Sequence, residues 1–185
     1  MAYELNTVTA LIVEDNYPMR EITKALLESF GVGTVVVAND GEEGLHQYKK
    51  TNPDIIILDW MMEHMNGLTF TVQIRNDKTG PNPYVPIILM TGFNEENRVK
   101  EARDCGITEY LAKPFTAKTL YSRVTQVIER PRPFVQSEDF LGPDRRRTKT
   151  TEYGGPLRRH DDVAPLPPYA RPANLPPEDI VLVDA

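Results

Sequence analysis

The 185-residue chain has one cysteine and three histidines. A membrane span needs about 20 consecutive apolar residues, and no apolar run of the sequence approaches this length. The lone Cys105 excludes an internal disulfide, and His46, His64 and His160 lack the spacing of metal ligands. No basic segment followed by an apolar one opens the sequence, so we expect no signal peptide. The formal net charge of −6 argues against unaided binding to nucleic acid. These absences predict a cytoplasmic protein that binds neither DNA nor membranes.

Proline is sparse in the first 130 residues and dense after them. Ten of the sixteen prolines fall between Pro131 and Pro177. Proline lacks a donor N–H and disfavours helix in the residue before it, so we predict a boundary at Arg130-Pro131. The sequence therefore predicts one domain over residues 1–130, followed over residues 131–185 by a proline-rich tail that is a linear interaction segment or disordered.

The first 130 residues alternate between short apolar runs and segments of helical periodicity. We expect strands at Val8–Val13, Thr34–Val37, Asp54–Leu58, Ile87–Met90 and Ile107–Leu111. We expect helices at Pro18–Phe30, Gly41–Lys50, Leu68–Arg75, Glu95–Asp104 and Thr116–Arg130. Wholly apolar, β-branched strands are typical of a parallel sheet covered on both faces. The pattern predicts a doubly wound α/β sandwich with a five-stranded parallel sheet of order 2-1-3-4-5.

Polar side chains stand where four of these strands end. Glu14-Asp15 follows the first strand, Asp59 the third, Thr91 the fourth and Lys113 the fifth. In open parallel sheets the functional site lies beyond the carboxyl ends of the strands. An acidic pair, a second acid, a hydroxyl and an amine at one edge are suited to phosphoryl transfer.

Taken in order, these residues resemble the receiver domain of two-component response regulators, a chemotaxis-type (βα)5 family with a flavodoxin-like fold. The resemblance covers about residues 5–130 and implies that Asp59 is the phosphoacceptor, with Glu14-Asp15 as the acidic pair. It likewise implies that Thr91 is the switch hydroxyl, that Tyr110 is the switch aromatic and that Lys113 is the lysine of a Lys-Pro-aromatic run. The donor would be a sensor histidine kinase or a histidine phosphotransfer protein.

The chemistry of such a site explains its residue types. A carboxylate can attack a phosphoryl group to give an acyl phosphate, and charge neutralisation dominates the catalysis. Packed carboxylates favour Mg²⁺, for which we expect Asp15, Asp59 and the backbone carbonyl of Met61 as ligands, with Glu14 acting through a bound water. Lys113 would supply a positive charge to a phosphoryl oxygen.

Two features depart from the family pattern. Glu63 stands where the family usually has proline, which adds a carboxylate near the site. Met61 and Phe93 occupy the positions two residues after the acceptor and the switch threonine. Neither side chain can orient a water molecule by hydrogen bonding, so we predict that both shield the acyl phosphate and that self-dephosphorylation is slow.

We expect phosphorylation to alter partner binding at the face built from the fourth helix, the fifth strand and the fifth helix. Thr91 would move toward the phosphoryl group and Tyr110 would turn into the space left. The charged and polar residues of mixed sign on this face suit a downstream protein or a homodimer: Asn94, Glu95, Glu96, Arg98, Lys118 and Arg123. Ordinary solvated surface is an equally good interpretation.

The tail carries a short internal repeat of an aromatic residue, Gly-Pro and paired arginines. The repeated residues are Phe140, Arg145 and Arg146 in one copy and Tyr153, Arg158 and Arg159 in the other. An arginine fork suits carboxylate or phosphate, so we predict that these residues contact another protein. A disordered tail is the alternative.

These features predict phosphorelay signalling through protein–protein binding, with no enzymatic activity beyond phosphorylation and slow dephosphorylation of Asp59. One alternative is an aspartyl-nucleophile phosphatase or phosphotransferase. Such enzymes typically carry a second aspartate where this chain has Met61, and they need a substrate pocket for which the chain has no insertion. The other alternative is a constitutive scaffold that acts through its tail.

Overall fold

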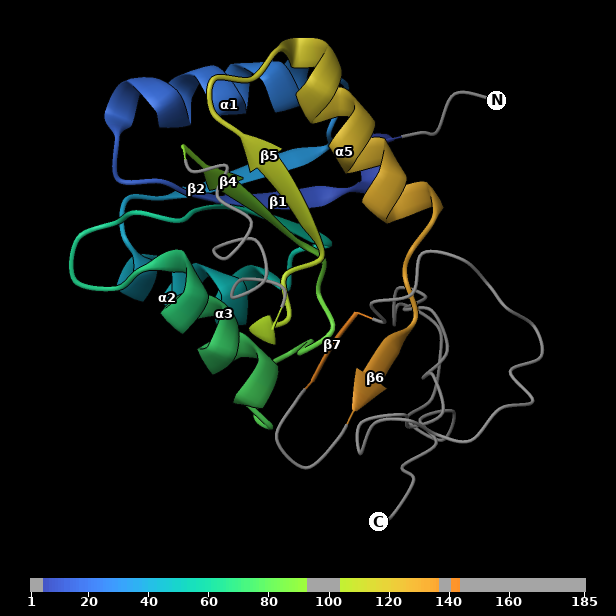
Figure 1. Cartoon of the computed structure of the whole chain (residues 1–185). Helices are drawn as coiled ribbons and strands as arrows, with labels where there is room; N and C mark the ends of the chain where they lie inside the picture. The colour runs from blue at the N-terminus through green and yellow to red at the C-terminus, as the bar shows by residue number, and fades with distance from the viewer. Residues whose placement is uncertain (1–4, 93–103, 137–140, 144–185) are drawn as a thin grey trace.

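The apolar runs of the sequence form one sheet in the computed structural model, which describes residues 5–92, 104–136 and 141–143 (Figure 1). The strands of this sheet are β1 (Thr9–Val13), β2 (Thr34–Ala38), β3 (Ile55–Asp59), β4 (Ile87–Thr91) and β5 (Glu109–Ala112). The helices are η1 (Leu5–Thr7), α1 (Tyr17–Ser29), α2 (Gly41–Thr51), α3 (Gly67–Asn76) and α5 (Ala117–Glu129). None of the described helices has the length and apolar character needed to cross a membrane.

The sheet has the predicted order, β2-β1-β3-β4-β5, and every neighbouring pair of strands is parallel. β3 and β4 are buried at all five of their residues, as expected for inner strands that are covered on both faces. The doubly wound α/β architecture is therefore confirmed. Its carboxyl-terminal edge brings the ends of β1, β3 and β4 side by side.

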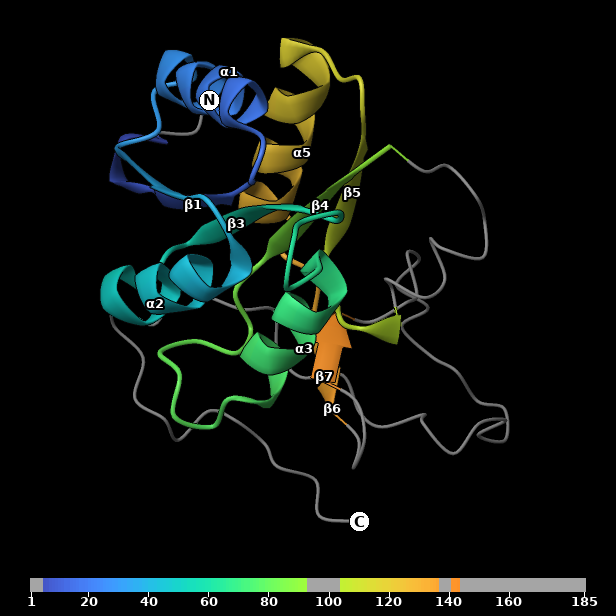
Figure 2. The same cartoon turned by 90° about the vertical axis from the view of Figure 1, so that its left-hand side faces the viewer.

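Helices cover both faces of the sheet, with α1 and α5 on one side and α2 and α3 on the other (Figures 1 and 2). Successive side chains of a strand point to opposite faces. Leu11 of β1 accordingly joins a buried cluster with Phe70 of α3, whereas its neighbour Ile12 joins a second cluster with Leu27 of α1 and Leu120 of α5.

Short polar side chains begin the helices at the expected places. Asp40 accepts a hydrogen bond from the backbone N–H of Glu43 at 2.7 Å and caps α2. Asn16 caps α1 in the same way, through the N–H of Met19 at 3.1 Å. Gly31 follows α1 with a φ of 84°, the left-handed conformation expected of a glycine there.

Three predicted strand boundaries differ in ways that matter for the site. β3 and β4 extend to include Asp59 and Thr91, so both residues are held within the sheet rather than in the loops that follow. The strand predicted to begin at Ile107 begins instead at Glu109, because Gly106 adopts a φ of 91° and turns the chain before the ladder starts. The helix predicted at Glu95–Asp104 lies outside the described residues, except for Asp104 itself.

A small hairpin after α5 is absent from the sequence-based expectations. β6 (Phe134–Gln136) and β7 (Leu141–Pro143) form a two-stranded antiparallel sheet, and β7 contacts α3. Phe134 is only 2% exposed, and its ring meets that of Tyr84 edge to face at 5.5 Å. The first residues of the proline-rich segment therefore pack onto the domain before them.

Arg75 of α3 is the centre of that contact. Its guanidinium is buried, donates to the carbonyl oxygens of Gly106 and Pro83, and lies 5.1 Å from the ring centre of Phe134. Burial lowers the pKa of Arg75 to about 9, so the group stays charged near neutral pH. Gly106 is required here, because a Cβ atom would lie 2.7 Å from the backbone oxygen of Leu141.

Candidate functional site

The carboxyl-terminal edge of the sheet gathers the polar residues singled out in the sequence. Glu14 directly follows β1, Asp59 ends β3, Thr91 ends β4 and Lys113 directly follows β5. The backbone joins two of these positions, since the N–H of Lys113 donates to the carbonyl oxygen of Thr91 at 2.7 Å. The strand register, and not a flexible loop, thus positions the acid, the hydroxyl and the amine.

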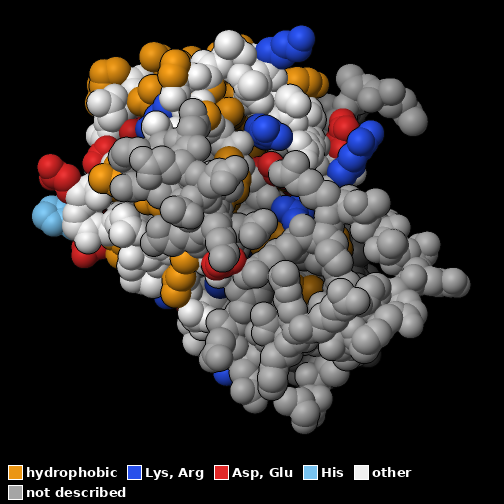
Figure 3. Space-filling model, in the orientation of Figure 1, with side chains coloured by type: hydrophobic (Ala, Val, Ile, Leu, Met, Phe, Trp, Pro, Cys, Tyr) orange, Lys and Arg blue, Asp and Glu red, His pale blue; other side chains and the backbone are white. Residues whose placement is uncertain are grey.

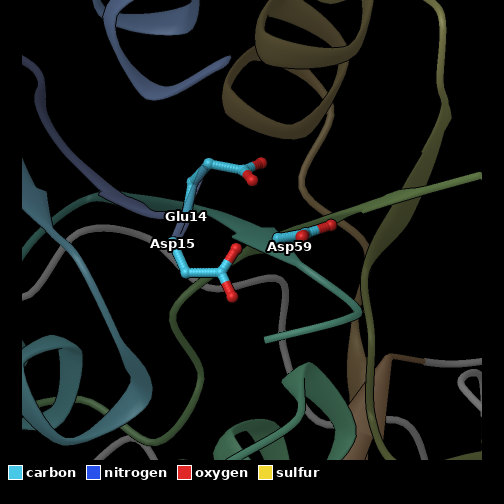
Figure 4. A group of neighbouring side chains, drawn as sticks. All are labelled: Glu14, Asp15 and Asp59. Atoms are coloured by element: carbon cyan, nitrogen blue, oxygen red, sulfur yellow. The ribbon is translucent and has the colours of Figure 1, made fainter. Parts of the chain in front are cut away.

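Three carboxylates form a cluster at this edge. Oxygen atoms of Glu14, Asp15 and Asp59 all lie within 4.8 Å of one another. The three side chains extend into a common space, with Glu14 and Asp15 coming from the end of β1 and Asp59 from β3 (Figure 4). Glu14 and Asp59 are buried, whereas Asp15 is exposed.

Lys113 bridges the two buried acids. Its Nζ lies 2.8 Å from Oε2 of Glu14 and 2.8 Å from Oδ1 of Asp59. Burial opposes the charged form of the ammonium, but its hydrogen bonds to Asp59 and Glu14 outweigh this and raise the pKa of Lys113 above 10.5. The amine expected to serve a phosphoryl oxygen therefore contacts Asp59, the carboxylate expected to accept that group.

For Glu14 the effect of burial outweighs that of the hydrogen bonds, the reverse of what is found for Lys113. Burial raises the pKa of Glu14 above its ordinary value of 4.5, and the nearby charge of Asp59 adds to this rise, although the hydrogen bond from Lys113 opposes it. The backbone N–H of Asn16 also donates to Glu14 Oε1 at 3.3 Å. Glu14 is thus a carboxylate that burial destabilises and that a further positive charge would stabilise.

The donor set of this edge fits a hard divalent cation. Ionised, the three carboxylates and the one ammonium leave a formal charge of −2 (−3 plus +1) around the cluster. Carboxylate oxygens are the ligands that Mg²⁺ prefers, and such a cation would relieve the repulsion among them. In the described residues, this is the one group of three or more His, Cys, Asp or Glu side chains close enough to share an ion.

Two backbone contacts at the cluster were missed by the sequence analysis. Arg20 of α1 donates from Nη1 to the carbonyl oxygen of Glu14 at 2.7 Å. The backbone N–H of Glu63 donates to Oδ2 of Asp15 at 3.2 Å. A signal for the first was available, because a cation in the first turn of a helix is disfavoured by the helix dipole and suggests another partner. The second requires a residue other than proline at position 63, but its formation depends on loop geometry that the sequence does not specify.

The remaining expected residues are distributed around this edge. Thr91 is buried at 3% exposure, and Tyr110 of β5 is half-buried against the cluster of side chains that includes Phe70. Met61 is 57% exposed. Lys118 is exposed, and Arg123 pairs with Glu109 at 3.6 Å.

Several expected residues lie outside the described part of the chain, so the predictions about them stay predictions. They are the shielding residue Phe93, the helix-face residues Asn94, Glu95, Glu96 and Arg98, and the tail residues Phe140, Arg145, Arg146, Tyr153, Arg158 and Arg159.

Comparison with known proteins identifies relatives of the folded part. Residues 10–125 match the response regulator receiver domain family. The chain is 34% identical over 120 residues to chemotaxis protein CheY-3 of Vibrio cholerae, covering 65% of this chain and 91% of that protein. It is 30% identical over 128 residues to the phosphate regulon transcriptional regulatory protein PhoB of Escherichia coli, covering 69% of this chain and 55% of that protein.

Solved structures give the same result. The chain superposes on V. cholerae chemotaxis protein CheY4 with a TM-score of 0.61 and 29% identity, over 65% of this chain and 98% of that one. A Francisella response regulator receiver domain gives a TM-score of 0.61 and 27% identity, over 67% of this chain and 98% of that one. The family match ends at residue 125, before the proline-rich segment begins.

Proposed function

The chain belongs to the response regulator receiver domain family, which works in two-component phosphorelay signalling, and on this premise we propose that Asp59 accepts the phosphoryl group. The observation that carries the proposal is the position of Asp59 at the end of β3, within 2.8 Å of Lys113 and in one cluster with Glu14 and Asp15. Family members interact with histidine kinases and downstream targets, so we propose a phosphohistidine protein as the donor.

In the proposed reaction, a carboxylate oxygen of Asp59 bonds to phosphorus while the P–N bond of the donor phosphohistidine breaks. The imidazole leaves with the electron pair of that bond, and Asp59 becomes an acyl phosphate. Lys113 is already within hydrogen-bond distance of Asp59, so its ammonium is positioned to follow the charge onto a phosphoryl oxygen. The domain thus catalyses its own phosphorylation without acting as an enzyme on other substrates.

We propose Asp15, Asp59 and the backbone carbonyl of Met61 as Mg²⁺ ligands, with Glu14 acting through a bound water. The 4.8 Å carboxylate cluster supports this assignment. When bound, Mg²⁺ would neutralise negative charge on the carboxylates and on the incoming phosphoryl group. Lys113 then has less carboxylate charge to balance and is freer to change partners.

Thr91 and Tyr110 are the proposed switch. Thr91 is buried at the end of β4, where its hydroxyl can donate to a phosphoryl oxygen on the neighbouring Asp59. Tyr110 is half-buried on the adjacent strand β5, which leaves room for a change in its packing. A phosphoryl group adds roughly −2 charge at this edge, enough to bias a two-state element.

We propose that the phosphoryl group is long-lived because Met61 and Phe93 shield it. Met61 is 57% exposed and carries no hydrogen-bonding group that would orient a water for attack. The test is decay of the phosphorylated protein in Mg²⁺. Met61→Asn combined with Phe93→Glu should shorten the lifetime of the phosphorylated protein. An unchanged lifetime would refute the proposal that Met61 and Phe93 shield the phosphoryl group.

The output is proposed to be protein binding, through the face of β5 and α5, through the segment after residue 130, or through a homodimer. Apolar side chains gather along the upper edge of the molecule, over α1 and the adjoining part of α5 (Figure 3). Among the described residues, the exposed large apolar side chains of α1 and α5 are Tyr17, Ile22 and Tyr121. We propose a receiver domain over residues 1–130 and a binding role for residues 131–185, of which the first part, β6 and β7, packs onto the domain.

The decisive experiment treats the full chain with a small acyl phosphate and Mg²⁺ and measures its mass and association state. We expect the mass to rise by one phosphoryl group in the wild type and to stay constant in Asp59→Asn. Absence of any mass gain in the wild type would refute the assignment. A second comparison, between the full chain and a chain ending at Pro143, tests whether residues 144–185 change association on phosphorylation.

A further inference from the structure

The loop between β3 and α3 is tied to the acidic pair by a single backbone group. The N–H of Glu63 donates to Oδ2 of Asp15, 3.2 Å away and 48 residues earlier in the chain. The side chain of Glu63 is exposed and makes no ion pair among the described residues. Position 63 therefore contacts the site through its main chain.

Asp15 is the one carboxylate of the cluster for which no contact with Lys113 is seen. Lys113 holds Glu14 and Asp59 at 2.8 Å each. Asp15 is exposed, and in the part of the chain that the structure describes, the Glu63 N–H is the donor to its carboxylate. Without it the carboxylate would rotate freely in water and would lose that freedom only when it bound a cation.

The loop itself is well fixed around residue 63. Its base is closed by a hydrogen bond from the N–H of Gly67 to the carbonyl oxygen of Trp60 at 2.9 Å. The carbonyl oxygen of Glu63 accepts from the N–H of Met65 at 2.7 Å, and His64 between them has a φ of 64°. A non-glycine residue keeps this left-handed conformation only where its surroundings hold it.

We propose that the backbone N–H of Glu63 is a positioning group that orders Asp15 and the β3–α3 loop, with its Met61 carbonyl, before a divalent cation binds. The inference rests on the proposed Mg²⁺ site. It assigns the role to the main chain and not to the added carboxylate of Glu63. Because proline has no N–H, the residue type at position 63 decides whether this link exists.

The test compares two substitutions at the same position. Glu63→Ala keeps the N–H and removes the carboxylate, whereas Glu63→Pro removes both. Trp60, the only tryptophan of the chain, directly follows Asp59 and is 5% exposed, so its fluorescence reports Mg²⁺ binding without any phosphorylation assay. We expect Glu63→Pro to weaken Mg²⁺ binding about fivefold, or about 1 kcal/mol, and Glu63→Ala to bind within twofold of wild type.

Either of two results would overturn the inference: equal Mg²⁺ affinity in Glu63→Pro and Glu63→Ala, or the full loss already in Glu63→Ala. A measurement on folded wild-type protein covers the case in which the proline variant does not fold. In nuclear magnetic resonance spectra, the Glu63 amide proton should lie downfield and move upfield in Asp15→Asn, and an unchanged shift would also overturn it. If wild-type protein binds no Mg²⁺ at all, the proposed metal site fails, which is a separate outcome.

Discussion

Phe134→Ala tests whether the hairpin after α5 belongs to the folded domain. The wild-type ring is 2% exposed, packs edge to face on Tyr84 and lies under the guanidinium of Arg75. Removing a buried phenylalanine ring typically costs 3–5 kcal/mol, and we expect about 3 kcal/mol because a peripheral hairpin can partly collapse into the space. That is a large share of the roughly 5–15 kcal/mol by which domains are stable.

Urea unfolding, followed by circular dichroism and by Trp60 fluorescence, measures this loss. In thermal unfolding we expect a fall of about 10 °C, since 1 kcal/mol corresponds to roughly 3–4 °C for a domain of this size. Val135→Ala is the matched control, because Val135 is the next residue of β6 and is only half-buried. It should cost less than about 1 kcal/mol.

Truncation separates the packing of the ring from the hairpin as a unit. A chain ending at Pro143 should unfold at nearly the same urea concentration as the full chain. A chain ending at Arg130 should lose at least as much stability as Phe134→Ala, because the Arg75 guanidinium then loses its contact with the Phe134 ring. Equal stability of the two truncated chains would refute the view that the hairpin is part of the folding unit.

Three further changes probe the carboxylate cluster. Lys113→Met leaves Glu14 and Asp59 facing each other without a cation, and we expect it to destabilise the metal-free protein by about 2 kcal/mol in urea unfolding and to abolish most phosphorylation. Because the pKa of Glu14 is raised in the folded state, this state holds an extra proton at pH values between the unfolded pKa of 4.5 and the higher folded pKa. The stability of the metal-free protein should therefore fall as the pH rises through this range. Glu14→Gln should flatten the fall in unfolding curves measured across pH. Arg20→Met removes the donor to the Glu14 carbonyl and should cost about 1 kcal/mol, whereas Lys24→Met, one turn further along α1, should cost little.

The edge of the sheet could be predicted from the sequence because its position depends on local patterns. Apolar β-branched runs define the strands, and a polar residue such as Asp59 or Lys113 at the end of a run must lie at the carboxyl edge of a parallel sheet. The partners within that edge could not be predicted in the same way. That Lys113 bridges Glu14 and Asp59 follows from the distances between strand ends, which the spacing of residues along the chain does not encode.

The hairpin was missed for a different reason. Its strands are three residues long and one contains proline, so they carry too little alternation to be read as strands. The sequence did offer an indirect sign. Arg75 lies on the stripe of α3 that also carries Leu68 and Thr71, both buried, and a charged residue on a buried stripe requires a partner from elsewhere in the chain.

The bridge made by Lys113 constrains how the site works. One ammonium is hydrogen-bonded to both buried acids, so the proposed attack by Asp59 would be slowed as long as Lys113 stays in that position. A divalent cation at the carboxylates would replace the positive charge that Lys113 supplies to Glu14, a group whose pKa is raised by burial. In the proposed reaction, Lys113 would then turn toward the oxygens of a phosphoryl group while Asp59 attacks. The same residue would therefore stabilise both the resting site, through its contacts with Glu14 and Asp59, and the proposed phosphorylated site, with no large movement of the sheet edge that positions it.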